Sequence, residues 1–108
     1  MAETPTKLKR GELAEATGIN SETLRFYEKA GLLKPERGAN GYRLYGEDDA
    51  KRIRLTQRAV GVGFSIQDVK SWLEDDAPGI ERALILIDAK AEEIDKLRKS
   101  LRKRLKKI

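Results

Sequence analysis

The chain contains no cysteine and no histidine. Their absence excludes disulfide bonds, thiolate chemistry, zinc-finger ligation and acid-base catalysis by imidazole, so we expect no metal or other cofactor. Nowhere do 18 apolar residues run together, and residues 1–7 lack the apolar core of a signal peptide. We therefore expect a cytoplasmic protein without a membrane span.

Catalytic patterns are missing as well. The sequence shows no nucleophile paired with a base, no phosphate-binding loop and no metal cluster at a useful spacing. We therefore predict that the protein is not an enzyme.

What the chain has in excess is positive charge. Its 108 residues include 23 Lys and Arg against 18 Asp and Glu, for a formal net charge of +5. This length accommodates one compact domain with an appendage. A basic balance is typical of proteins that bind a polyanion, although many charged helical proteins share it, so the charge alone is a weak indication.

Two short helices are predicted near the start of the chain. The first covers residues 11–17 and is stopped by Gly18, while the second covers residues 22–30 and is stopped by Gly31. Asn20 and Ser21 are suitable residues to cap the start of the second helix. Two short helices joined by a turn that contains glycine are typical of a helix-turn-helix.

A small β-hairpin wing is predicted next. Pro35 rules out a continued helix, and Asn40-Gly41 is the strongest short signal for a hairpin turn. Residues 42–45 alternate in the manner of a short strand. Basic and aromatic residues in this segment would lie beside the second helix.

Two further helices follow the wing. Acidic residues at 47–49 favour the start of a third helix that runs to about residue 59, since carboxylates are stabilised at helix N-termini. Ser65 and Asp68 form a capping-box pattern that begins a fourth helix, which carries Trp72 on its apolar side. We expect a short linker at residues 75–79, where the apolar pattern breaks.

Beyond the linker, apolar residues recur at alternating spacings of three and four. This spacing is typical of a coiled-coil seam, and no later segment of the chain could cover it, so we predict a homodimer. The predicted dimerisation residues are Ile80, Leu84, Ile87, Ala91, Ile94, Leu101 and Leu105. The predicted fold is therefore mainly α: a winged helix-turn-helix of four short helices and a β-hairpin wing, followed by a long coiled-coil helix.

The DNA-contacting surface is predicted from the second helix and the wing. A recognition helix presents long donors to the major groove of double-stranded DNA, and a basic patch with interleaved aromatics recurs on the wing. For one of the two aromatics, Phe26 or Tyr27, a place in the core is an equally open interpretation. The predicted DNA-binding residues are Thr23, Arg25, Phe26, Tyr27, Arg37, Tyr42 and Arg43, with Arg58 as an additional candidate.

Four strings resemble the MerR family of bacterial transcription regulators in order and spacing. They are residues 11–14 (GELA), 23–35 (TLRFYEKAGLLKP), 40–45 (NGYRLY) and 63–66 (GFSI). The resemblance implies a DNA-binding domain over residues 1–75 and a linker with an antiparallel coiled-coil dimerisation helix over residues 76–108. It also implies a dimer that binds a pseudo-palindromic promoter, distorts the spacer DNA and thereby lets RNA polymerase engage.

The chain departs from the family pattern at two positions. Arg10 stands where many members have Ile, so packing or phosphate contact at the start of the first helix would differ. Val60 stands where a basic residue of the second wing is common, which leaves Arg58 as the nearby candidate. Members usually continue into an effector part; this chain ends at Ile108, so we expect a natural short form or a truncated form without a ligand site.

Residues 96–107 contain eight basic residues and no acidic one. They are either a solvated helix end or a segment that lies near DNA or an acidic partner. Two alternatives to a transcription regulator stay open. One is an architectural, excisionase-like DNA-bending factor, and the other is a coiled-coil adaptor with no DNA role.

Overall fold

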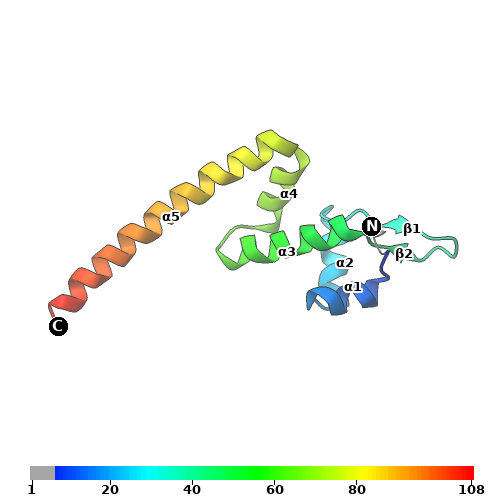
Figure 1. Cartoon of the computed structure of the whole chain (residues 1–108), viewed down its shortest axis with the longest axis horizontal. Coiled ribbons are helices and arrows are strands. Elements are labelled where there is room, and N and C mark those ends of the chain that lie inside the picture. The colour runs from blue at the N-terminus through cyan, green and yellow to red at the C-terminus, as the bar shows by residue number, and fades with distance from the viewer. Residues whose placement is uncertain (1–6) are drawn as a thin grey trace, which may run out of the picture. The chain divides into compact units, whose positions relative to one another are not determined.

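The computed structural model describes residues 7–108. The chain forms two compact units, one reaching to Lys70 and the other covering Ser71–Ile108. The division falls inside the fourth helix, a few residues before the predicted boundary at 75. The elements are α1 (Arg10–Thr17), α2 (Ser21–Lys29), β1 (Glu36–Arg37), β2 (Arg43–Leu44), α3 (Glu47–Gly61), α4 (Ile66–Glu74) and α5 (Asp76–Lys106) (Figure 1). The predicted fold class, helices with a small wing and a long last helix, is confirmed.

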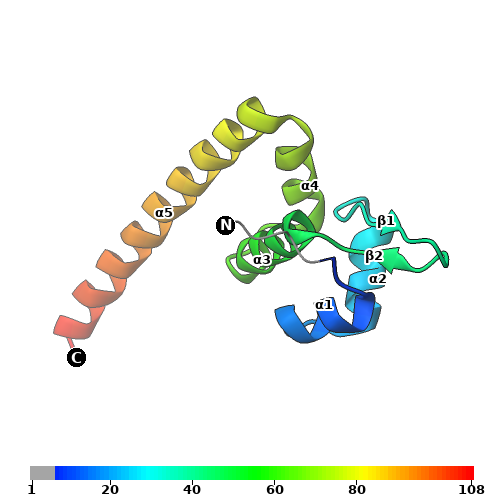
Figure 2. The same ribbon diagram turned by 45° about the vertical axis from the view of Figure 1, so that its right-hand side comes forward.

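Local capping signals define the helix-turn-helix. Gly18 ends α1 in the left-handed conformation, with φ of 76°, which glycine adopts without steric cost. The side chain of Asn20 then accepts a hydrogen bond from the backbone N–H of Thr23 at 2.8 Å and so starts α2. α1 packs against both α2 and α3, and the fully buried Leu13 and Leu24 belong to this core (Figures 1 and 2).

The wing is a two-stranded antiparallel sheet. Glu36 pairs with Leu44 and Arg37 pairs with Arg43, while Gly41 closes the turn at φ of 79°. The chain before α1 also joins this hairpin, because Leu8 and Tyr45 exchange backbone hydrogen bonds of 2.8 and 2.7 Å. The wing is therefore bound to the helical core from both sides.

Asp49 secures the start of α3. One carboxylate oxygen accepts the backbone N–H of Gly46 at 3.0 Å, and the other accepts that of Lys34 at 3.1 Å. The hydrogen bond from Lys34 connects the segment before the wing to α3, the helix after the wing. Ser65 and Asp68 form the predicted reciprocal capping box at the start of α4.

The predicted linker at residues 75–79 is wrong. α5 already begins at Asp76, whose φ of 50° turns the chain between α4 and α5; Asp is one of the few residues that tolerate this conformation. Pro78 fits in the first turn of α5, because backbone N–H groups there have no partner within the helix. The sequence signals for a break thus mark a corner between two helices.

Gly79 is required by that corner. A Cβ atom at this position would lie 2.0 Å from the carbonyl oxygen of Trp72. We predict that Gly79→Ala lowers the free energy of unfolding by about 1–3 kcal/mol, the usual range for overpacking. Urea titration at a fixed protein concentration measures the change. Gly61→Ala is the matched control, since a Cβ there meets nothing within 4 Å; equal stability of the two variants would contradict the prediction.

Candidate nucleic-acid interface

α2 has one buried face and one exposed face. Leu24 and Tyr27, three positions apart, are buried in the core, whereas Arg25 and Phe26 are exposed. The helical repeat explains this division, because residues three apart lie on the same side. Phe26 is 57% exposed, so an apolar ring is held in solvent on a small domain. Such exposure marks a candidate binding surface.

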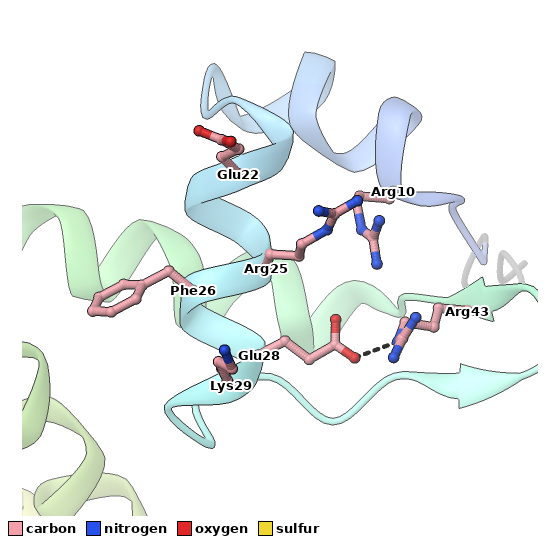
Figure 3. Close-up of a pocket in the computed structure, with 7 residues that line it drawn as sticks. All are labelled: Arg10, Glu22, Arg25, Phe26, Glu28, Lys29 and Arg43. Carbon is pink, nitrogen blue, oxygen red and sulfur yellow. Dashed lines mark hydrogen bonds and ion pairs between the residues drawn. The ribbon is translucent and has the colours of Figure 1, made fainter.

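Beside α2 lies a groove of about 570 Å³, which we call the arginine groove. Side chains from α1, α2 and β2 form it: Arg10, Glu22, Arg25, Phe26, Glu28, Lys29 and Arg43. Figure 3 shows Arg10, Arg25, Glu28 and Arg43 on the same side of α2, while Phe26 points away from them. Three guanidinium groups therefore gather around one carboxylate.

That carboxylate, Glu28, joins the helix to the wing. Its Oε2 accepts a hydrogen bond from Arg43 Nε, and its Oε1 accepts one from the Tyr45 hydroxyl at 2.8 Å. Tyr45 is fully buried, and burial, together with the Glu28 carboxylate, raises its pKa; the Arg10 guanidinium acts in the opposite direction. The position of Arg43 relative to α2 is thereby set by a partly buried contact.

The far part of the wing is exposed. Arg37 donates from Nη1 to the carbonyl of Gly41 at 3.1 Å, across the turn. Tyr42 is 61% exposed, and the Lys9 ammonium lies 5.5 Å from its ring centroid, within cation–π range. The wing thus presents Arg37 and an exposed aromatic ring, and the Lys9 ammonium lies beside that ring.

The structure brings most of the predicted DNA-binding residues to the surface, but not all of them. Tyr27 is only 7% exposed and belongs to the core, so its prediction as a DNA contact is wrong; burial raises its pKa. Thr23 is half-buried in the first turn of α2. Arg58 is exposed in the last turn of α3 and does not line the arginine groove.

Three cations on this surface were not among the predicted DNA-binding residues. Arg10 and Lys29 line the arginine groove, and Lys9 stands over Tyr42. The sequence shows Lys7, Lys9 and Arg10 close together, but the backbone bridge between Leu8 and Tyr45 is what places them beside the wing.

α5 carries an exposed apolar stripe. All seven predicted dimerisation residues are exposed on it, including Ile87 and Leu101. Leu97 was not predicted, yet it lines a hollow of about 350 Å³ with Ile94, Leu101 and Leu105. Arg98 lines the same hollow, so the apolar stripe at this level includes Leu97 beside the predicted residues.

Two further findings concern the described part of the chain. No three acidic side chains in residues 7–108 are grouped so that they could hold a metal ion. Within the same residues, no helix is both long and apolar enough to cross a membrane.

The fold and the surface together define a winged helix-turn-helix of the DNA-binding class. Residues 8–76 match the MerR HTH family of regulatory proteins, and the chain belongs to this family. It is 41% identical over 101 residues to the HTH-type transcriptional regulator HmrR of Rhizobium leguminosarum bv. viciae, a match that covers 84% of this chain and 78% of that protein. The membership confirms the predicted class, a DNA-binding transcription regulator and not an enzyme.

Other relatives match over a smaller part of their length. The mercuric resistance operon regulatory protein of Serratia marcescens is 37% identical over 86 residues, covering 78% of this chain and 60% of its own. A solved structure of HiNmlR, a MerR family regulator lacking the sensor domain and bound to promoter DNA, is similar with a TM-score of 0.71 and 28% identity. That match covers 93% of this chain and 82% of the other.

The Glu28–Tyr45 contact leads to a pH prediction. Both Tyr27 and Tyr45 have pKa values raised above 10.0 in the folded state, so the unfolded chain releases their protons first as pH rises. These two groups should therefore leave the free energy of unfolding constant below about pH 10 and lower it above that pH. In Tyr45→Phe the free energy should be lower by about 1.5–3 kcal/mol at neutral pH, because a charged acceptor loses its donor.

Urea titrations across this pH range measure both effects. Only Tyr27 is left to titrate with a raised pKa in Tyr45→Phe, so its stability should decline less steeply above pH 10 than that of the wild type. Identical slopes in the two proteins would contradict the assignment.

Proposed function

We propose that the protein reads double-stranded DNA with α2 in the major groove and the wing on the flanking backbone. The observation that carries this proposal is the joint presentation of Arg25 from α2 and Arg43 from β2 beside one groove. Arg25 is exposed and makes no hydrogen bond or ion pair with the residues that the structure describes, so its donors are available to a base edge or a phosphate. Phe26 offers a flat apolar surface on the same helix.

We further propose that two copies pair through α5. Leaving the α5 stripe in water is unfavourable, by about 25 cal/mol for each Å² of apolar surface, and a second copy would cover it. The charges favour an antiparallel arrangement. Residues 74–95 hold eight acidic and two basic side chains, whereas residues 96–107 hold eight basic ones and no acidic one. An antiparallel pair sets each acidic half against a basic half, whereas a parallel pair opposes like charges.

The dimer then accounts for action at a promoter. Two identical heads on a two-fold axis match a pseudo-palindromic site. We propose that the dimer bends and untwists the spacer between the two promoter elements, in the cytoplasm, so that RNA polymerase engages both. Deformation of this kind costs on the order of 1–6 kcal/mol and itself contributes to specificity. The structure of HiNmlR on promoter DNA supports this role.

The first test is selection from random duplex DNA. The wild type should enrich an inverted repeat, and Arg25→Ala should weaken binding to it by about 1–3 kcal/mol with the dimer intact. Arg43→Ala should also weaken binding, although it additionally removes a partner of Glu28. Lys51→Gln is the control, since its charge is paired with Glu47. Absence of any enriched sequence at moderate salt would overturn the proposal.

In vitro transcription on the selected site distinguishes regulation from the architectural alternative. A regulator changes the amount of transcript when protein is added. A bent site with an unchanged transcript would instead identify an excisionase-like factor.

The dimer has its own test. Leu101→Gln should weaken dimerisation at least tenfold, because burial of a leucine contributes roughly 1.5–3 kcal/mol in each copy. Lys103→Gln, a neighbouring change outside the stripe, should leave the dimer unchanged. Analytical ultracentrifugation measures both. A wild type that is monomeric at micromolar concentration would contradict the proposal.

A further inference from the structure

Arg10 is the least explained side chain of the arginine groove. It is the first residue of α1, is half-buried, and lines the groove together with Arg25 and Arg43. Its Nε atom is buried and has no hydrogen-bond partner among the described residues. A buried unpartnered donor is unfavourable and rare, so packing does not account for this nitrogen. The rest of the guanidinium interacts with the Tyr45 side chain, whose pKa it acts to lower.

The charges around Arg10 are not balanced. Glu28 is the one carboxylate that Figure 3 shows among the three guanidinium groups, and both of its oxygens are already engaged by Arg43 and Tyr45. Glu22 also lines the groove but points away from the arginines (Figure 3). Three positive charges therefore share one negative charge, which leaves an excess that repels itself in the free protein.

We propose that Arg10, Arg25 and Arg43 jointly bind one phosphate group of the DNA backbone where the start of α1 meets α2 and β2. Guanidinium groups are planar forks that match phosphate oxygens, and convergence from three elements supplies donors from several directions. Binding a phosphate removes the repulsion that the free protein carries. The proposal rests on the proposed function, since Arg25 and Arg43 belong to the surface that reads DNA.

This assignment gives Arg10 a role in the affinity for DNA and not in the choice of sequence. Phosphate contacts add affinity and fix the position of a protein on DNA, but they carry no sequence information of their own. Arg10 should therefore strengthen binding equally to all sequences. Its effect should appear in the salt dependence of binding, because each phosphate contact releases condensed counterions.

The test compares the wild type with Arg10→Gln, Arg10→Lys and Lys51→Gln on the selected duplex and on a scrambled duplex, each at several salt concentrations. Arg10→Gln should reduce the slope of log K against log salt, by at most about 0.9, the value for one fully lost phosphate contact, because Arg25 and Arg43 still reach the same phosphate. It should weaken binding to both duplexes by the same factor. Arg10→Lys keeps the charge and should keep the slope, and Lys51→Gln should match the wild type.

The outcomes separate this inference from the proposed function. If the wild type shows no preference between the duplexes, the proposed function fails. If the preference is present but Arg10→Gln keeps the wild-type slope, the phosphate site is overturned. Equal loss of affinity in Arg10→Gln and Arg10→Lys, with thermal unfolding shifted in both, would also overturn it, because the role would then be structural.

A second readout identifies the source of the phosphate. The Arg10 Nε–H resonance should shift when the DNA duplex is added to the full chain. Inorganic phosphate, added alone, should shift it only at millimolar concentrations. A response to inorganic phosphate without a response to duplex DNA would overturn the assignment to the DNA backbone.

Discussion

The DNA-binding surface depends on one half-buried carboxylate. Glu28 projects from α2 and accepts hydrogen bonds from Arg43 and Tyr45 of the wing, so a helix and a strand that are 15 residues apart in the chain share one charge. Two-stranded sheets are only marginally stable by themselves. The contact with Glu28 and the backbone bridge between Leu8 and Tyr45 hold this short hairpin in a defined position. Without them, Arg43 would have no fixed position relative to Arg25.

In the second unit, a single helix supplies both the apolar surface and the charges for dimerisation. α5 exposes leucine and isoleucine side chains along its length, while its charges separate into an acidic half and a basic half. The apolar side chains favour association, and the charges favour one direction of association. A DNA-binding domain of this size gains specificity when two copies are held at a fixed spacing. The apolar stripe and the charge separation of α5 therefore both support the proposed dimer.

Elements set by neighbouring residues could be predicted from the sequence. The Gly18 stop, the Asn20 cap and the Gly41 turn each depend on contacts within a few residues, and all three occur as expected. The sequence predicted a linker at residues 75–79 where the structure has a corner between two helices, because proline and glycine occur in linkers and in such corners alike. Only the approach of Gly79 to the backbone of Trp72 shows which of the two applies.

The sequence by itself determined the class of the protein: its helix order, its wing, its family and the unpaired apolar stripe. The helix order, the wing and the stripe follow from local propensity and periodicity, which the order of residues encodes directly. The family follows from the resemblance of four short strings. The tertiary structure decided which side chains are available to bind DNA. It buried Tyr27, engaged Arg43 with Glu28, and brought Arg10 from the start of α1 to the groove. Burial and charge pairing depend on residues far apart in the chain, and no pattern within one segment specifies them.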